Sequence, residues 1–396
     1  MLTLVALACL PPALLTPWPV GPPSEPVAAV RLAGEQSSAV PGDPDPGAAV
    51  DPATRPPRPR VRTVTLALTG DVLVHDNVWA SAGREGARSR AAFDFRPLLA
   101  SLRPRISGAD LAICHLETPL APRGGPYSGY PLFAAPQEVV PALAWVGYDA
   151  CSTASNHTVD EGFAGVTRTL DVLDTTGLQH TGSARTPAEA RRIVVLRSHG
   201  LRVAWLSYTY GTNGMPVDAD KPWSVNLIDV PRILDDARRA RAHGADAVLV
   251  ALHWGDEYSH SPSTFQLDVA DRLTRSGEVD LVYGHHAHVV QPIRRVNGTW
   301  VVFGLGNLLA GQGTTAPGVS DGMVAEVTLR QRGRPGHWGP VRVLRPSYAP
   351  THIDYADPHG EFRVYDVDRA LALGGLDAAT RAELLASRAA TAAVLR

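Results

Sequence analysis

The stretch Leu281-Val282-Tyr283-Gly284-His285-His286-Ala287-His288 sets three histidines within four residues, directly after a short apolar run. The apolar run predicts a buried strand, and packing in a core does not require three imidazoles. On an extended segment His286 and His288 project to the same side, because side chains alternate along a strand. Two imidazoles on one side can bind a metal together. The stretch therefore predicts a metal site at a strand end, with His285 turned away from it in a supporting position.

Five further segments place a carboxylate, an amide or an imidazole beside glycine or at the expected end of a strand. They are Thr69-Gly70-Asp71, His115-Leu116-Glu117, Ser155-Asn156-His157, Leu252-His253-Trp254-Gly255 and Leu305-Gly306-Asn307. The carboxyl ends of parallel strands open onto one rim of a sheet, where ligands collect. The mixture of oxygen and nitrogen donors suits first-row divalent metals. The number of donors is too large for one tetrahedral zinc, so we expect a site for two metals.

Each segment also has an ordinary structural explanation when it is taken alone. Gly70-Asp71 is typical of a turn, and Asn156-His157 is compatible with an Asn turn before a helix cap. A single histidine such as His253 at the end of an apolar run is more often a core residue with its hydrogen bonds satisfied. The occurrence of all six segments in one chain favours the metal site.

Apolar runs and helical periodicity alternate along the chain, which predicts an α/β fold. Strands are expected at 62–68, 110–115, 149–153, 194–196, 203–208, 247–252, 281–283, 300–303, 323–329 and 341–344. Helices are expected at 95–102, 138–145, 165–173, 230–243, 264–275 and 378–395. Asp377 is placed to cap the last of these helices.

Composition divides the chain into four parts. Residues 1–16 form an apolar segment similar to a secretory signal or a short anchor, and residues 17–61 form a linker rich in Pro, Gly and Ala. Residues 62–350 are the expected catalytic domain, and 351–396 a C-terminal extension that ends in a helix. The N-terminal segment favours an extracytoplasmic protein, secreted or anchored to the membrane. A cytoplasmic location stays open, because the segment lacks a basic start.

Charge and cysteine content exclude some classes of function. The formal net charge is -2, with 37 basic and 39 acidic residues, so nucleic acid is not an expected partner. Cys114 and Cys151 each lie in an apolar, strand-like run and are expected to be buried, unreactive thiols. On that interpretation the cysteines do not identify the compartment.

The six segments together resemble the CapA family of poly-γ-glutamate capsule synthesis proteins, which has a calcineurin-like metallophosphoesterase fold. The resemblance covers roughly residues 64–327. It implies a four-layer α/β/β/α sandwich with a dinuclear metal centre on the loops at one edge. The matching motifs are Gly70-Asp71, Leu116-Glu117, Asn156-His157-x-x-Asp160-x-Gly162, His253-Trp254-Gly255-x-Glu257, Gly284-His285-His286-x-His288-Val289-Val290-Gln291-Pro292 and Leu305-Gly306-Asn307.

The resemblance also implies a role for each matching residue. The implied ligands of two divalent metal ions (Mn, Fe, Zn or Co) are Asp71, Glu117, Asn156, His253, His286 and His288. His157 would be the acid that protonates a leaving group, with Asp160 holding its ring. His285, Glu257 and Asn307 would support the ligands or contact substrate. The Asp-x-His opening of ordinary metallophosphoesterases is Asp71-Val72-Leu73 here, so position 73 offers no ligand.

Three functions fit such a site. The first is a two-metal hydrolysis or transfer in the biosynthesis or processing of an anionic capsule polymer, at a phosphoester or an amide. The second is deprotonation next to a metal-bound carboxylate, as in the peptide epimerase of lasso-peptide biosynthesis that the family includes. The third is a non-catalytic domain that binds the polymer for a membrane-bound synthase or exporter. The expected ligand is an anionic polymer or peptide in each case.

Overall fold

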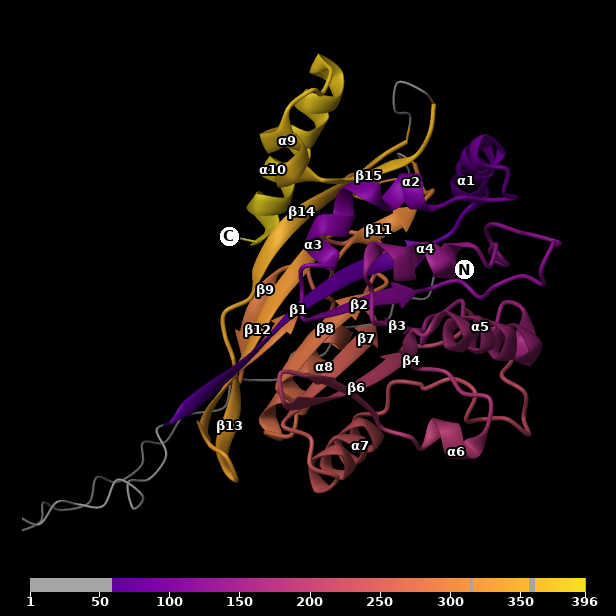
Figure 1. Ribbon diagram of the computed structural model, residues 1–396. Helices are drawn as coiled ribbons and strands as arrows, with labels where there is room; N and C mark the ends of the chain where they lie inside the picture. Colours follow the sequence, from indigo (N-terminus) through magenta and orange to yellow (C-terminus); the bar gives the residue numbers. More distant parts are fainter. Residues whose placement is uncertain (1–58, 314–315, 356–359, 396) are drawn as a thin grey trace, which may run out of the picture. The chain divides into compact units, whose positions relative to one another are not determined.

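The computed structural model describes residues 59–313, 316–355 and 360–395. The expected N-terminal segment (1–16) and almost all of the expected linker (17–61) therefore lie outside the described residues. From residue 59 onward the chain forms two β-sheets enclosed by helices (Figure 1).

The first sheet has nine strands in the described residues, in the order β15-β14-β12-β1-β2-β3-β4, with β11 paired to β1 and β13 paired to β12. The second has six strands, in the order β5-β6-β7-β8-β10-β9. The strands of the first sheet are β1 (Arg60–Leu73), β2 (Leu111–Leu116), β3 (Ala150–Ser152), β4 (Gln179–Thr181), β11 (Asn307–Ala310), β12 (Asp321–Arg334), β13 (His337–Val343), β14 (Ser347–Asp354) and β15 (Arg363–Asp366). Those of the second are β5 (Val194–Ser198), β6 (Leu201–Thr209), β7 (Ala247–His253), β8 (Leu281–His285), β9 (Ile293–Val296) and β10 (Thr299–Val302).

Helices flank both sheets. They are α1 (Asp76–Ser89), α2 (Arg96–Leu99), α3 (Arg103–Ile106), α4 (Val139–Val146), α5 (Gly162–Thr176), α6 (Pro187–Ala190), α7 (Val230–Ala242), α8 (Thr264–Arg275), α9 (Val367–Leu373) and α10 (Ala378–Leu395), with a 3-10 turn (Ala100–Leu102) between α2 and α3. In the described residues no helix combines the length and the apolar character that crossing a bilayer requires.

Side-chain alternation along the strands separates three hydrophobic layers. Leu66 and Leu68 of β1 pack in one cluster with Trp205 and Leu249 of the second sheet, so the two sheets pack face to face. Ala67, which lies between them in the sequence, points to the opposite face and joins the cluster formed with α2, α4 and α5. β1 thus serves two layers, as the period of two along a strand requires.

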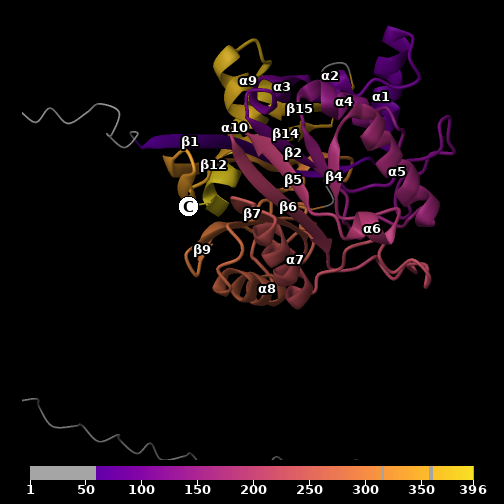
Figure 2. The same cartoon turned by 60° about the horizontal axis from the view of Figure 1, so that its bottom comes forward.

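The second sheet repeats this arrangement on its outer face. Val248 and Val250 of β7 pack with Ile233 of α7 and Leu273 of α8. Figure 2 shows α7 and α8 on one side of the strands and α2, α3 and α4 on the opposite side. The layers therefore run helix, sheet, sheet, helix, and the four-layer α/β/β/α expectation is confirmed.

Capping residues fix where several helices begin. The hydroxyl of Ser263 accepts a hydrogen bond from the backbone N–H of Gln266, and the side-chain oxygen of Gln266 accepts one from the backbone N–H of Ser263. This capping box starts α8 at the expected residue. Asp229 caps α7 through the backbone N–H of Arg232. Asp377 accepts from the backbone of Thr380 at 3.0 Å, so the expected cap of α10 is present.

The residues that follow Gln331 extend the edge of the first sheet. β13 and β14 pair with β12, and β15 pairs with β14, before α9 and the expected terminal helix α10. The sequence analysis did not anticipate β14, β15 or α9. It also missed α1, because the sequence of that helix carries three arginine or glutamate residues and two glycines among few apolar ones.

The expectation that Cys114 and Cys151 are free thiols is wrong. β2 and β3 are neighbouring parallel strands in which Cys114 lies directly opposite Cys151. Their Cα atoms are 4.4 Å apart and the two sulfurs form a disulfide. This Cα separation falls within the range that a disulfide requires. The sequence could not reveal it, because strand register is not visible in the spacing of the two cysteines.

Replacing both cysteines by serine should destabilise the protein. The disulfide closes a loop with a sequence separation of 37, and removing such a cross-link typically costs about 2–4 kcal/mol of unfolding free energy. Urea unfolding of the double variant Cys114→Ser, Cys151→Ser against wild type measures this loss. Thiol titration of unreduced, unfolded wild type should detect no thiol besides Cys9. Detection of three reactive thiols would contradict the pairing.

Candidate metal centre

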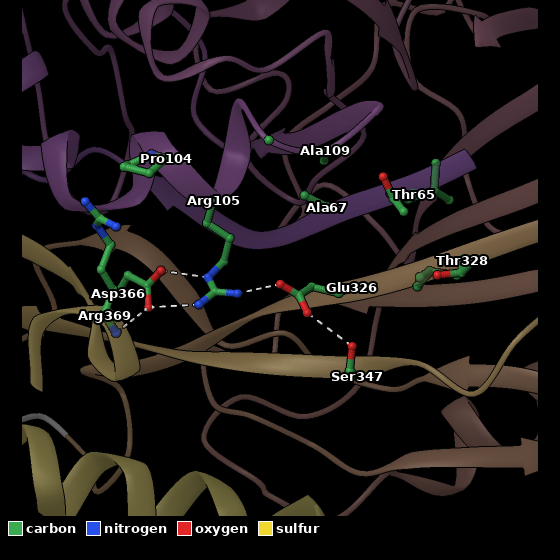
Figure 3. A pocket seen from close by; sticks show the side chains of 13 residues that line it. Thr65, Ala67, Pro104, Arg105, Ala109, Glu326, Thr328, Ser347, Asp366 and Arg369 are labelled. Carbon is green, nitrogen blue, oxygen red and sulfur yellow. Dashed lines mark hydrogen bonds and ion pairs between the residues drawn. The ribbon is translucent and has the colours of Figure 1, made fainter. Parts of the chain in front are cut away.

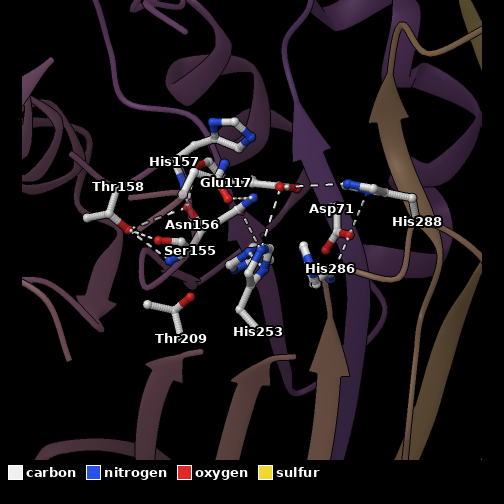
Figure 4. A network of polar contacts seen from close by, with 12 residues as sticks. Asp71, Glu117, Ser155, Asn156, His157, Thr158, Thr209, His253, His286 and His288 are labelled. Atoms are coloured by element: carbon white, nitrogen blue, oxygen red, sulfur yellow. Dashed lines mark hydrogen bonds and ion pairs between the residues drawn. The ribbon is translucent and has the colours of Figure 1, made fainter. Parts of the chain in front are cut away.

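The carboxyl-terminal ends of strands from both sheets meet at one edge of the sandwich. The first sheet contributes Asp71 from β1, Glu117 just after β2 and Asn156 from the turn after β3. The second contributes His253 at the end of β7 and the histidines that follow β8. Figure 4 shows these side chains directed toward one another. The six residues expected to be metal ligands are therefore brought together, and all six are buried.

Glu117 lies at the centre of this group. Its Oε1 atom is 3.7 Å from Nε2 of His253 and 4.0 Å from Nε2 of His288 (Figure 4). Potential ligand atoms of Glu117, His253 and His286 lie within 4.8 Å of one another, as do those of Asp71, Glu117 and His288. Glu117 thus belongs to two overlapping sets, which is the geometry of a bridging ligand.

The carboxylate of Glu117 has no hydrogen-bond partner for either oxygen among the described residues. Burial raises the pKa of this side chain well above its ordinary value. A buried carboxylate without a partner is costly unless a cation or a proton compensates it. The other buried ligand atoms without a partner are Asp71 Oδ1 and His286 Nδ1. This set of donor atoms fits one or more divalent cations.

Asp71 lies inside β1 and not beyond its end, because the strand continues to Leu73. The pairing register of β1 shifts on both sides of Asp71, which stands opposite His115 on one neighbour and Asn307 on the other. Oδ2 of Asp71 accepts from the backbone N–H of His286 at 3.0 Å. Burial raises the pKa of Asp71, but hydrogen bonding to His288 and nearby imidazole charge outweigh burial and lower it to about 2. Asp71 is therefore anionic at neutral pH.

Gly70 lets two strands approach closely beside Asp71. A Cβ atom at position 70 would lie 1.8 Å from the carbonyl oxygen of Gly306, and the backbone N–H of Asp71 donates to that same oxygen at 3.1 Å. Only glycine fits this contact. The Gly-Asp pair is thus explained by packing of β1 against the segment that leads into β11.

The expectation of an extended His-x-His segment is wrong. β8 ends at His285, and both His286 and His288 have left-handed backbones, with φ of 84° and 57°. Such values are uncommon for residues with a side chain and mark a conformation held by its surroundings. The turn, rather than strand alternation, directs the two imidazoles into the centre.

Asn307 fixes the orientation of His288. Its Nδ2 donates to Gln312 at 2.7 Å and to the carbonyl of Val319 at 2.9 Å. Oδ1 of Asn307 therefore faces Nδ1 of His288, 3.0 Å away, and accepts a hydrogen bond from it. This arrangement leaves Nε2 of His288 directed toward Glu117. The pKa of His288 rises to about 9, because the charges of Glu117 and Asp71 outweigh burial, which acts to lower it. The site thus attracts positive charge.

His115 belongs to the centre, although the sequence analysis assigned only Glu117 from that segment. Its Nε2 is 3.0 Å from Nδ1 of His253, and its Nδ1 is 2.9 Å from the hydroxyl of Ser152. The available signal was its position two residues before Glu117, on the same face of one strand. Burial lowers the pKa of His115 and His253 well below the ordinary value, so both rings are neutral, the form that binds metal.

Asn156 and His285 complete the surroundings of these rings. Oδ1 of Asn156 lies 2.7 Å from Nε2 of His253. His285 stacks on His115 with ring centroids 4.1 Å apart, and its Nε2 is 3.2 Å from the carbonyl of Thr69. Potential ligand atoms of Asp71, His115 and His285 also lie within 4.8 Å of one another. His285 is thus in a different set from His286 and His288.

His157 and Asp160 form a buried pair next to the cluster. Nδ1 of His157 is 2.7 Å from Oδ2 of Asp160, and the backbone N–H of Phe133 donates to that same carboxylate oxygen at 2.8 Å. Both residues lie in turns before α5, not in a helix. They line a cavity of about 610 Å³ together with His288 and Glu257. Glu257 is exposed, and one of its oxygens lies within 4.8 Å of ligand atoms of His286 and His288.

A second cavity, of about 500 Å³, lies beside the middle of β1 and is lined in part by Arg105, Glu326 and Asp366. These charges satisfy one another, because the guanidinium of Arg105 pairs with both carboxylates (Figure 3). None of these residues belongs to a set of potential metal ligands in the described chain. The first cavity is therefore the one associated with the cluster.

Comparison with known proteins places this geometry in a family. The chain is 28% identical to the capsule biosynthesis protein CapA of Bacillus anthracis, over 50% of this chain and 49% of that protein. It is 30% identical to the PGA biosynthesis protein CapA of Bacillus subtilis (strain 168), over 50% and 51% respectively. The chain thus spans about half the length of the curated relatives it matches.

Among solved structures, the calcineurin-like phosphoesterase YfkN of Bacillus subtilis is 14% identical, covering 73% of this chain and 91% of that one at a TM-score of 0.44. At that TM-score the likeness carries no functional inference. The sequence profile described as "Bacterial capsule synthesis protein PGA_cap" matches residues 65–312. This range includes the whole cluster and more than half of the chain, which therefore belongs to the bacterial capsule synthesis protein family.

Proposed function

We propose that this protein is a metal-dependent enzyme that hydrolyses or transfers a bond of a poly-γ-glutamate-type capsule polymer. The observation that carries the proposal is the buried carboxylate of Glu117, which has no hydrogen-bond partner in the described chain and belongs to two sets of potential ligands, one with His253 and His286 and one with Asp71 and His288. A binding domain for a polymer has no need of such a desolvated anion. A two-metal centre requires one, because the bridging ligand must neutralise charge from both sides.

The proposed ligands follow from the two overlapping sets. Asp71 and His288 would hold one ion and His253 and His286 the other, with Glu117 common to both sets. Asn156, whose Oδ1 lies 2.7 Å from Nε2 of His253, would join the second set. Manganese, iron, zinc and cobalt all suit this mixture of oxygen and nitrogen donors. When bound, such ions lower the pKa of water and stabilise negative charge on the reacting group.

In this proposal His157 moves the proton. Asp160 holds its Nδ1 at 2.7 Å, so the other ring nitrogen is free for substrate in the adjoining cavity. An imidazole held in this way can protonate a departing oxygen or nitrogen near neutral pH. His157 lies outside the sets of potential metal ligands in the described residues, whereas Asn156 next to it places Oδ1 2.7 Å from Nε2 of His253.

The substrate and the location are proposed from the relatives and from the disulfide. The names of the two Bacillus proteins refer to capsule and PGA biosynthesis, which supports an anionic polymer as substrate and a membrane-bound synthase or exporter as partner. A disulfide between Cys114 and Cys151 is typical of proteins outside the reducing cytoplasm. Both observations support an extracytoplasmic protein, and thiol trapping in intact cells tests the location.

Replacing Glu117 by Gln should remove metal while preserving the shape of the side chain. Wild type is expected to bind two ions per chain by elemental analysis, and Glu117→Gln should bind fewer. In the metal-free protein the variant should melt at the same or a higher temperature than wild type, because burial raises the pKa of Glu117 and folding must therefore protonate this carboxyl, a cost that glutamine does not carry. Adding manganese should raise the melting temperature of wild type more than that of the variant.

Glu278→Gln is a matched control, because Glu278 precedes β8 at the opposite end of that strand from the histidines. This control should keep the metal content and the manganese response of wild type. Full metal content in Glu117→Gln would rule out a bridging carboxylate at this position.

Replacing His157 by Ala should lower turnover without removing metal. The expected loss on poly-γ-glutamate is ~10²–10⁴-fold, the usual contribution of a general acid or base. New chain ends released from the polymer measure turnover, and elemental analysis measures the ions. Asp160→Asn should give a smaller loss in the same direction, because the ring stays but its orientation is less fixed. Loss of metal from His157→Ala would show that His157 is a ligand, and unchanged turnover would exclude the proposed proton transfer.

A further inference from the structure

The cavity beside the metal centre contains a second histidine that the proposed mechanism does not use. Its walls include His75 and His157, which both contact the ring of Phe133. The ring centroid of Phe133 is 5.0 Å from that of His75 and 4.7 Å from that of His157, and both contacts are edge-to-face. The two imidazoles therefore contact one aromatic ring in the wall of the same cavity.

Backbone contacts fix the position of the proton on His75. Its Nδ1 lies 3.0 Å from the backbone nitrogen of Gly311 and 3.0 Å from the carbonyl oxygen of Leu73. The N–H of Gly311 can only donate, so Nδ1 must accept with its lone pair. The carbonyl of Leu73 already accepts from the backbone N–H of His75 at 3.0 Å. The ring proton of neutral His75 is therefore on Nε2.

Burial keeps the ring neutral, since it is the largest effect that lowers the pKa of His75 to about 4. The residue is 9% exposed. Among the described residues, the side-chain atoms that are both fully enclosed and without a hydrogen-bond partner do not include Nε2 of His75. The accessible part of His75 thus includes an N–H donor that opens onto the cavity. No described residue accepts a hydrogen bond from it.

The composition of the cavity makes such a donor significant. Of the described residues that line it, none is Lys or Arg, and Glu257 and Asp160 are acidic. Leu73, Pro131 and Leu132 provide apolar surface. Apart from the histidines, the side-chain donors available to an oxygen of a bound substrate are therefore uncharged ones, from Tyr130, Asn213, Tyr258 and Gln312. A neutral imidazole N–H can bind such an oxygen without also attracting a free counter-ion.

We propose that His75 is a substrate-binding residue whose Nε2–H donates a hydrogen bond to an oxygen of the molecule held at the metal centre. This inference rests on the proposed function, because it takes the cavity as the substrate site. His75 holds an acceptor oxygen, and His157, which contacts the same ring of Phe133, moves a proton. The two histidines divide binding and proton transfer between them.

A pair of variants separates this role from a merely structural one. His75→Asn places an amide oxygen near the position of Nδ1, so it can still accept from Gly311, but it has no group near Nε2. His75→Gln places an amide N–H near the position of Nε2 but leaves Gly311 without its acceptor. The probe is inorganic phosphate, titrated calorimetrically into the full chain loaded with manganese and freed of excess metal.

We expect His75→Asn to bind phosphate ~10-fold or more weakly than wild type, and His75→Gln to bind more tightly than His75→Asn. Both should retain the metal content of wild type. His199→Asn is the control, because His199 lies at the turn between β5 and β6 and pairs with Asp110; it should bind phosphate as wild type does.

The opposite order, with His75→Asn unchanged and His75→Gln weakened, would overturn the proposal and leave His75 only the task of holding Gly311. Equal binding by wild type and both variants would overturn it as well, while leaving the proposed function intact. A metal-loaded wild type that binds no phosphate would contradict both, because the centre would then accept no oxyanion.

Discussion

The buried carboxylate of Glu117 is the constraint on which the rest of the site depends. It lies between the histidines of two strands with no hydrogen-bond donor of its own in the described chain. Burial of such a group is costly unless a cation or a proton compensates it. The neighbouring groups fit this requirement. The imidazoles of His253 and His286 are neutral, and the carboxylate of Asp71 on the other side is an anion.

The two-sheet architecture is what makes this concentration of ligands possible. β1 and β2 bring carboxylates from the first sheet, and β7 and β8 bring imidazoles from the second. The interior cluster that contains Leu66 and Trp205 packs the sheets face to face and thereby holds the two kinds of ligand at a fixed separation. A cation bound between them would join the two sheets, so that metal binding and folding stability are coupled.

Much of this could be predicted from the sequence, because the signals were local. Strand-ending motifs contain every residue of the proposed ligand set, and helical periodicity gave the bounds of α8. The failures concern relations between strands. The pairing of Cys114 with Cys151 depends on the register of β2 and β3, and the recruitment of His115 depends on which face of β2 meets the second sheet. The left-handed turn at His286 and His288 has no signature in residue type, since histidine has no preference for that conformation comparable to that of glycine.

One side of the site is enclosed by protein contacts, and the other opens onto the cavity. Ser152, His115, His253 and Asn156 form a continuous chain of polar contacts on the inner side, where each imidazole has a fixed partner for at least one nitrogen. On the outer side, His157 and His75 each use one ring nitrogen in an internal hydrogen bond, and the other nitrogen remains available to the cavity. The histidines of this inner chain have both nitrogens in contact with protein groups and form the centre with their neighbours, whereas a histidine with a single nitrogen engaged is oriented and still able to act on a bound molecule. This difference in hydrogen bonding, rather than distance along the sequence, distinguishes the residues that build the centre from those that face the cavity.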